Sequence, residues 1–176
     1  PYILAGQPFL AAGQHSAMYP LSILFYILPL TAAYGWFAAL HLFLAGAFTY
    51  ILARTLRLSR SGGALAAVTF EFCGFTVTHN VFPMIVAAMV WLPLILAVIE
   101  RIVNRAEAGD ARPLAYMLDL ALGAAAFGMV FLAGHPEMYY YAALASAAFT
   151  LWRLVGLFRR QRRALPVLAI AGALSA

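Results

Sequence analysis

The positive charges of this chain fall into three short clusters that are separated by long uncharged stretches. All eleven basic residues are arginines, and the clusters lie at residues 54–60, 101–112 and 153–163. Between the clusters lie apolar stretches in pairs, and each pair is broken by a short turn that carries a histidine. A chain that crosses a membrane repeatedly with its basic loops in the cytoplasm has this distribution. The pattern predicts a multi-span membrane protein whose arginine loops are cytoplasmic and whose histidine turns lie outside.

Composition supports a membrane environment. Hydrophobic residues make up 65% and charged residues 10% of the 176 residues, whereas soluble domains carry about 25% charged residues. A soluble protein of this length could not bury so much apolar surface. The formal net charge of +5 would ordinarily suggest nucleic-acid binding. Because the arginines lie at the ends of the predicted spans, membrane topology and anionic lipids explain the charge, and no nucleic-acid partner is expected.

The ends of the chain and its single cysteine set two further limits. The sequence starts at Pro1 without a signal-peptide pattern and ends in an apolar run at 164–176, which is shorter than the ~20 residues that a helical span needs. We therefore expect an internal piece of a longer protein. Cys73 lies alone in an apolar segment, so we expect a small core residue there, and neither a disulfide nor a thiolate metal site.

The apolar stretches predict an all-α transmembrane helical bundle with about five spans and part of a sixth. The expected spans cover residues 31–53, 62–78, 83–99, 114–133 and 138–158. Pro93 predicts a kink in the third span, because proline interrupts the backbone hydrogen bonds of a helix.

The chain divides into an outer loop at residues 1–30 and a transmembrane domain at residues 31–176. Within the loop, residues 21–28 are apolar and lie between two prolines. Eight residues cover about 12 Å as a helix, which is too short to cross a membrane. We expect this segment to lie in the interface or to re-enter the membrane.

Three inner turns are predicted between the spans. Turn residues indicate the first at 59–63 and the second at 100–113. Asp110 is expected to cap a helix that begins at Pro113. The last arginine cluster indicates a third inner turn at 159–163.

Glu71 is the clearest ionisable residue within a predicted span. It lies seven residues before Thr78, which is about 10 Å along a helix. Intramembrane carboxylates are expensive and mark functional sites by default. His41 has a similar estimated depth in the first span, so the two side chains form a predicted intramembrane polar pair. Two interpretations stay open: a neutral acid that joins two helices by a hydrogen bond, or a group that handles protons or substrate.

The other three histidines lie in the predicted outer turns. These turns carry Gln14 and His15, His79 and Asn80, and His135 and Glu137. Histidine together with a carboxylate can perform acid–base chemistry, bind phosphate or hold a metal. The spacing matches no metal-ligand motif, so no metal site is predicted and the cofactor, a divalent metal included, is left open. The alternative is that His79 and His135 only cap helices at tight turns.

Charged residues near the inner edge have a simpler interpretation. Asp119 and Arg153 lie within a turn or two of that edge, and we expect both to snorkel to the interface. The sequence contains no Walker-type loop, no Gly-x-Ser-x-Gly and no His-Glu-x-x-His. A P-loop ATPase, an α/β-hydrolase and a zincin are therefore not supported.

Several motifs, in the same order along the chain, resemble those of the YfhO family of bacterial membrane proteins. They are the stretch at 1–10, Gln14 with the segment at 19–21, the segment at 40–46, the segment at 91–94 with Glu100 and Arg101, and the segment at 134–136. Each motif is short, but together they cover nearly the whole chain. The resemblance implies the GT-C architecture, which is that of multi-span glycosyltransferases that take sugar from a polyprenyl-phosphate carrier on the outer face of the bacterial inner membrane.

The resemblance also implies an acidic catalytic residue in the first outer loop. Residues 1–70 contain no Asp or Glu, and Ala12 stands where the loop pattern has an acid. We expect the catalytic acid to lie upstream of Pro1 or to be missing. Within this chain Glu137 is the candidate for that role.

The expected substrate-binding residues are neutral or aromatic groups on the outer face. They are Gln14, His15, Tyr19, His79, Asn80 and His135. We expect His15 and His135 to bind the carrier phosphate and Tyr19 to stack on a sugar. The partners would be membrane lipids, the polyprenyl-phosphate sugar donor and a glycan or glycolipid acceptor.

Two other classes of protein remain as alternatives. A non-enzymatic transporter or lipid flippase would use Glu71 and His41 as an intramembrane relay and would depend on a gradient. A scaffold subunit whose outer loops bind another protein would tolerate the loss of either residue.

Overall fold

The computed structural model describes the backbone of residues 16–174 and the side chains of residues 16–159. Its elements in chain order are η1 Pro20–Ile23, α1 Leu24–Ile27, α2 Leu30–Thr55, α3 Arg60–Glu71, α4 Gly74–His79, α5 Pro83–Met89, α6 Leu92–Glu107, α7 Pro113–Leu132 and α8 Pro136–Leu174. Each of these elements is helical, which confirms the all-α class predicted from the sequence.

Four helical stretches within the described residues are long and apolar enough to cross a membrane. They are Leu30–Thr55, Pro83–Glu107, Pro113–Leu132 and Pro136–Arg159. They correspond to the first, third, fourth and fifth predicted spans. The chain is therefore a multi-pass membrane protein.

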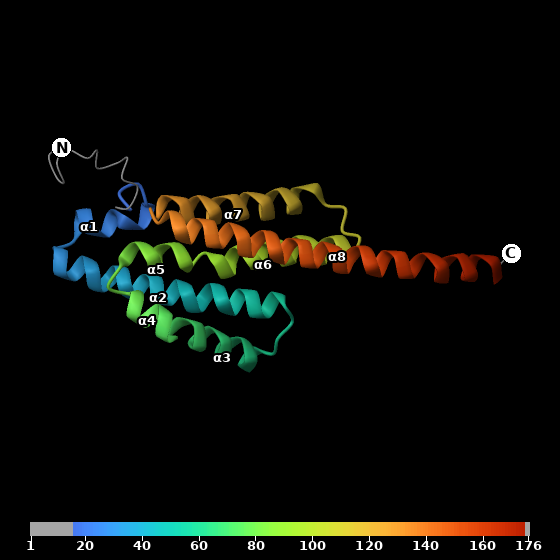
Figure 1. Cartoon of the computed structure of the whole chain (residues 1–176), viewed down its shortest axis with the longest axis horizontal. Helices are drawn as coiled ribbons and strands as arrows, with labels where there is room; N and C mark the ends of the chain where they lie inside the picture. The colour runs from blue at the N-terminus through green and yellow to red at the C-terminus, as the bar shows by residue number, and fades with distance from the viewer. Residues whose placement is uncertain (1–15, 175–176) are drawn as a thin grey trace.

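The bundle is built around α6. Figure 1 shows α6 in the middle, with α2 on one side and α7 and α8 on the other, while α3 packs on α2 away from α6. Inside the bundle 56% of the α5–α6 span is buried, against 11% of the α8 span. Because α6 contacts α2, α7 and α8, polar side chains on it can join three neighbours.

The second predicted span, at 62–78, is not one continuous helix. The backbone leaves the helical conformation after Glu71, and α4 begins only after two further residues. Cys73 has an extended backbone with ψ 154°, and Thr76 Oγ1 donates to the Phe70 carbonyl across the break at 2.9 Å. The hydroxyl thus satisfies a carbonyl that has lost its helical partner. Cys73 lies at this break and is only partly buried, so the core position expected for it is wrong.

The inner turn predicted at 59–63 is shorter than expected, because its glycines belong to α3. Ser59 is the N-cap of α3, and its Oγ accepts a hydrogen bond from Gly62 N at 3.1 Å. A Cβ at Gly63 would lie 3.1 Å from the ring of Tyr50 on α2. The absence of a side chain there lets α3 pack closely on α2.

Pro93 produces the predicted break in the third span. The proline ring clashes with the carbonyl four residues earlier, which belongs to Met89, the last residue of α5. Helix α6 follows after two residues and runs to Glu107. The long inner loop predicted at 100–113 is therefore wrong, and only residues 108–112 lie outside the helices.

The loop between α6 and α7 is closed by Gly109 and Asp110. Gly109 is in the left-handed conformation (φ 66°), and its N–H bonds the carbonyl of Ala106 while Asp110 N bonds that of Arg105. This is the Schellman ending of a helix. Arg112, not Asp110, is the N-cap of α7, which corrects the predicted cap. Asp110 Oδ1 accepts from Arg112 N at 3.1 Å instead.

Helix α2 ends in the same motif without a glycine. Arg57 has φ 67°, its N–H bonds the Arg54 carbonyl at 3.1 Å, and Leu58 N bonds the Ala53 carbonyl at 3.0 Å. The Arg54 side chain also donates to the carbonyl of Leu58. An arginine therefore holds a left-handed position that ordinarily favours glycine.

Helix α8 is continuous over Pro136–Leu174 and is 39 residues long. The inner turn predicted at 159–163 is therefore wrong. Arginine and glutamine are good helix formers, so the charge cluster there marks no turn in the backbone.

Candidate functional site

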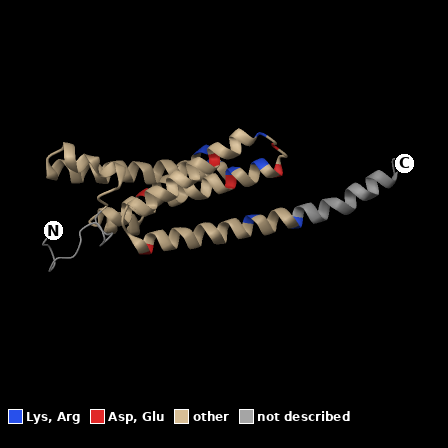
Figure 2. Ribbon diagram, turned by 90° about the horizontal axis from the view of Figure 1, so that it is seen from above, with Lys and Arg blue, Asp and Glu red and all other residues tan. Residues whose placement is uncertain are grey.

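The two ends of the bundle differ in charge. At one end α2 and α6 finish and α7 begins; this arginine end carries Arg54, Arg57, Arg60, Arg101, Arg105 and Arg112. At the other, α2 and α8 begin and α4 and α7 finish; we call it the histidine end. Figure 2 shows the blue segments of the described chain toward the arginine end and none at the histidine end.

The two outer turns that the structure describes both lie at the histidine end. His79 is the last residue of α4 and is followed by Asn80, whereas His135 precedes α8 and Glu137 lies in its first turn. Helix α4 ends and α8 begins at the same end of the bundle (Figure 1). The predicted topology requires this placement of the two turns.

Both described outer-turn histidines bond the ends of helices. His79 Nδ1 lies 2.9 Å from the Phe75 carbonyl oxygen, and the two rings stack with centroids 4.1 Å apart. Met138 N donates to His135 Nδ1 at 3.4 Å. The His135 ring thus satisfies an N–H of the first turn of α8, as the capping interpretation predicts, whereas the His79 ring bonds a carbonyl four residues earlier in its own helix. Glu137 is exposed, and a carboxylate in the first turn also stabilises the helix through its dipole.

Residues 16–23, which belong to the predicted outer loop and are called the outer segment below, are attached to the bundle through serine hydroxyls. Gln14 and His15 lie outside the described residues. Directly after them, Ser16 Oγ donates to the Ala133 carbonyl in the α7–α8 turn at 2.5 Å, and Ser22 Oγ donates to the Ser16 carbonyl at 2.8 Å. These bonds hold the start of η1 against the end of α7.

A buried chain of neutral hydrogen bonds provides a second attachment. Tyr19, directly before η1, is 2% exposed. Its hydroxyl lies 2.9 Å from His41 Nε2 on α2 and accepts from Trp91 Nε1 at 3.0 Å. His41 Nδ1 in turn lies 2.7 Å from the Phe37 carbonyl oxygen. The chain joins three elements that are far apart in sequence.

The protons of this chain can be assigned from its acceptors. A carbonyl cannot donate, so His41 Nδ1 carries the proton and Nε2 accepts. The Tyr19 hydroxyl therefore donates to His41 and accepts from Trp91. Burial raises the pKa of the Tyr19 phenol well above its usual value, although the Trp91 hydrogen bond acts in the opposite direction. Every member of the chain is neutral and has a partner.

Two predicted roles disagree with this arrangement. The ring of Tyr19 is buried in the core beside Phe37, with centroids 6.2 Å apart, so it is not available to stack on a sugar in this conformation. The predicted His41–Glu71 pair is also wrong, because both ring nitrogens of His41 bond other groups. The positions of the two residues along their predicted spans indicated the same depth in the membrane. They could not predict the direction in which either side chain points.

Glu71 instead lies against the backbone of α2. A Cβ at Gly46 would be 2.6 Å from Glu71 Oε2, so the glycine leaves space for the carboxyl group. Glu71 is the last residue of α3, directly before the helix break, and is partly buried. No described residue forms a hydrogen bond or an ion pair with it. A carboxyl group beside a break in an apolar helix can receive a proton or a cation.

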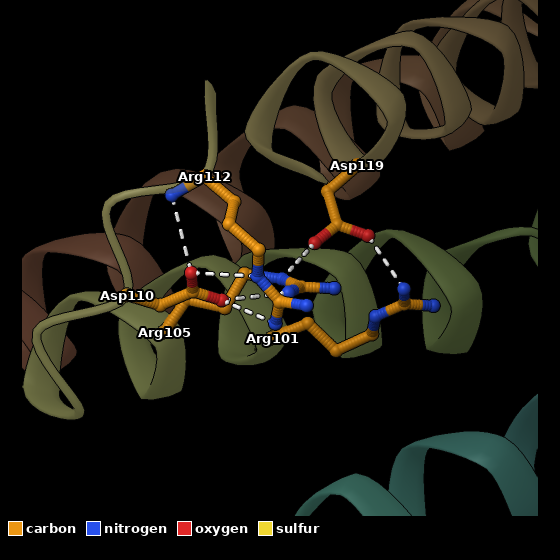
Figure 3. Close-up of polar contacts among 5 residues, drawn as sticks. All are labelled: Arg101, Arg105, Asp110, Arg112 and Asp119. Atoms are coloured by element: carbon orange, nitrogen blue, oxygen red, sulfur yellow. Dashed lines mark hydrogen bonds and ion pairs between the residues drawn. The ribbon is translucent and has the colours of Figure 1, made fainter. Parts of the chain in front are cut away.

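Ion pairs fill the arginine end. Figure 3 shows Asp119 of α7 between two arginines of α6, with Arg101 Nη2 at 2.7 Å and Arg105 Nε at 2.8 Å. Asp119 is 1% exposed, so the snorkelling predicted for it is wrong. Asp110 accepts from Arg112 and Arg105, and the hydrogen bonds from Arg112 hold the pKa of Asp110 well below its usual range.

Arg153 also points inward rather than to the interface. Its Nε donates to Glu100 Oε2 at 2.6 Å, and its Nη2 lies 3.6 Å from Glu107 Oε1. Both carboxylates are on α6, so this arginine joins α8 to α6. Sequence reasoning missed the pair because its members are 53 residues apart.

No group of three His, Cys, Asp or Glu residues within residues 16–159 is arranged to hold a metal ion. The hydrogen bond from Trp91 to Tyr19 is a further contact that the sequence did not suggest, since nothing in the third span indicates a partner in the outer segment. The chemistry available at the histidine end is hydrogen bonding by imidazole and amide groups, together with one exposed carboxylate.

Comparison with known proteins identifies a family. The family model described as bacterial membrane protein YfhO matches residues 14–176. Neither the curated proteins nor the solved structures contain a match to this chain.

Proposed function

Because this chain belongs to the YfhO family of bacterial membrane proteins, we propose that it is part of a GT-C-type glycosyltransferase. It transfers a sugar from a polyprenyl-phosphate carrier to a glycan or glycolipid acceptor on the outer face of the inner membrane. The family match over residues 14–176 is the observation that carries this proposal. Residues 1–30 serve as the outer loop and residues 31–176 as the transmembrane domain, with the arginine end in the cytoplasm.

The histidine end has the groups that such a substrate requires. A polyprenyl tail stays in the bilayer, so its phosphate and sugar lie at the interface. His135 Nδ1 accepts from Met138 N, which places the proton of the neutral ring on Nε2, a donor for a phosphate oxygen. His79 Nδ1 donates to the Phe75 carbonyl, which leaves Nε2 as an acceptor for a sugar hydroxyl. Asn80, directly after His79, adds an amide.

The direct test is transfer of labelled sugar from a polyprenyl-phosphate donor by the purified full-length protein in lipid. We expect His135→Ala to weaken donor binding, and Glu137→Gln to lower the rate by about 10²-fold or more if Glu137 is the general base. Glu71→Gln is the matched control, since it removes a carboxylate away from the outer turns and is expected to leave transfer intact. Absence of transfer with any polyprenyl-phosphate sugar would reject the enzyme.

One observation supports a transporter or lipid flippase as the second candidate. Glu71 has no partner among the described residues and lies at the break between α3 and α4. Broken helices with an intramembrane carboxylate are common at transport sites. His41 is occupied by Tyr19 and Phe37, so the relay would depend on Glu71 alone. A gradient-driven flux that Glu71→Gln abolishes, without sugar transfer, would favour this candidate.

A further inference from the structure

A cavity lies beside α6 at the arginine end. Its volume is about 280 Å³, and it is lined by Arg101, Asn104, Arg105, Ala108 and Asp110. Arg101, Asn104 and Arg105 share one face of α6, because residues three and four apart lie on the same side of a helix, and Ala108 is the C-cap of this helix. Asp110 closes the cavity from the α6–α7 loop.

The lining of this cavity carries a net positive charge. When their ion-pair partners are included, three arginines (Arg101, Arg105, Arg112) against two aspartates (Asp110, Asp119) leave one positive charge around the cavity. Asp119, which pairs with both arginines, is 1% exposed and lies on the α7 side of them, as Figure 3 shows. Both oxygens of Asp110 already accept from Arg105 or Arg112. Both acidic groups are therefore paired with arginines, and the remaining guanidinium N–H groups can donate hydrogen bonds to a ligand.

Several donors in the lining are available. Arg101 uses Nη2 on Asp119, and its side chain is 43% exposed. No other described residue accepts from Arg101, and the amide of Asn104 has no partner among the described side chains. A guanidinium and an amide one helical turn apart form a set of donors without a matching acceptor.

The level of the cavity in the membrane indicates the kind of ligand. The α5–α6 span has 25 residues, which is about 37 Å at 1.5 Å per residue, longer than a hydrocarbon core of about 30 Å. The last turns of α6, where the cavity lies, therefore reach the headgroup region. Arginine matches the geometry of phosphate oxygens, and basic pockets at this level hold anionic headgroups.

We propose that the cavity lined by Arg101, Asn104 and Arg105 is a binding site for a phosphate anion, which its membrane level indicates is the headgroup phosphate of an anionic phospholipid. The phosphate oxygens accept from Arg101 and Asn104, and the net charge of the lining is neutralised. This site is separate from the histidine end and does not depend on the proposed transfer reaction.

Native mass spectrometry of the purified full chain in detergent tests this site, with phosphatidylglycerol and phosphatidylcholine as probes. Asn104→Asp keeps the shape of the side chain but cancels the net positive charge of the lining. We expect it to weaken phosphatidylglycerol binding about tenfold, because one added negative charge near the phosphate has about this effect at intermediate dielectric. Binding of phosphatidylcholine should not change. Arg60→Gln is the control, because it also lowers the net charge of this end by one but lies outside the cavity. We expect it to change phosphatidylglycerol binding by less than twofold.

Equal losses in Asn104→Asp and Arg60→Gln, or no preference for phosphatidylglycerol over phosphatidylcholine, would contradict the site. Competition by millimolar inorganic phosphate at constant ionic strength would identify free phosphate as the ligand source, and its failure would identify the lipid headgroup. Ala108→Glu is a second variant, which fills the cavity with a carboxylate. It must weaken phosphatidylglycerol binding as well, so a folding defect in Asn104→Asp would not hide the result.

Discussion

At the arginine end α6 is joined to its neighbours by ion pairs, whereas at the histidine end α2 is joined to the outer segment by hydrogen bonds between neutral groups. Asp119 lies between Arg101 and Arg105. Tyr19 lies in the same way between two partners, but these are an imidazole and an indole. Each central group is buried at 1–2% exposure, so the two ends differ in charge and not in burial.

This difference predicts unequal stability. A buried charge that loses its partner costs about 3–5 kcal/mol, whereas a buried neutral group that loses a hydrogen bond costs about 1–3 kcal/mol. The arginine end is therefore the more strongly fixed part of the bundle. Regions that admit ligands open more easily than the core, and the neutral hydrogen bonds of the histidine end are consistent with the substrate-binding role proposed for it.

The largest effect is expected from Arg153→Met. It leaves Glu100, whose side chain is 8% exposed, without its closest cation. We predict a loss of about 3–5 kcal/mol in the free energy of unfolding, measured by SDS-titrated unfolding in mixed micelles. The double variant Arg153→Met/Glu100→Gln removes both charges of this pair and is expected to recover part of the loss. An unchanged unfolding midpoint in the single variant would show that the pair does not hold α8 to α6.

A smaller effect is expected from Tyr19→Phe at the histidine end. The change leaves Trp91 Nε1–H and His41 Nε2 without their shared partner, and we predict a loss of about 1–3 kcal/mol in the same assay. Tyr26→Phe is the control, because Tyr26 is 76% exposed and removal of its hydroxyl is expected to be neutral. A loss equal to that of Arg153→Met would remove the proposed difference between the ends.

Arg57→Gly is expected to stabilise the fold. Arg57 has φ 67°, a conformation that costs about 1–2 kcal/mol for residues other than glycine. The greater freedom of glycine in the unfolded chain offsets part of this gain, which leaves about 0.5–1 kcal/mol. Gly109→Ala, at the equivalent position of α6, should destabilise. A loss of stability in Arg57→Gly would mean that the arginine side chain itself holds the α2–α3 turn.

The smallest effect is confined to low pH. Hydrogen bonds from Arg112 lower the pKa of Asp110 in the folded protein, so the carboxylate stabilises the fold above its unfolded pKa of about 3.9. This contribution is lost as the pH falls below that value toward the folded pKa. Unfolding measured from pH 7 to pH 3 should be less acid-sensitive in Asp110→Asn than in the wild type. Parallel pH curves would contradict this prediction.

The sequence predicted most of the membrane-spanning helices but not their side-chain partners. Arginine clusters and apolar stretches predicted four of the spans, and Pro93 predicted the break between α5 and α6. The α3–α4 break was missed, because the apolar run at 62–78 shows no proline and the break depends on a hydroxyl bonding the Phe70 carbonyl. Composition suggested turns at 59–63 and 159–163, but residues 60–63 and 159–163 are helical.

The candidate site was predicted at the level of its turns. Charge distribution placed His79 and His135 away from the arginines, and the structure places both residues at the end of the bundle opposite the arginine end. The partners of His41 could not be predicted, since depth in a span does not fix rotation about the helix axis. For the same reason the sequence did not show that Asp119 and Arg153 point into the bundle rather than toward the interface.

The proposed assignment of the histidine end to the outer face is the central claim, and sided cysteine labelling tests it most directly. In a Cys73→Ala background, Asn80→Cys and Ala108→Cys place one thiol at each end of the bundle. A membrane-impermeant maleimide added to intact cells is predicted to label Asn80→Cys and to reach Ala108→Cys only after the membrane is opened. Labelling of Ala108→Cys in intact cells, with Asn80→Cys protected, would contradict the orientation and with it the site of sugar transfer.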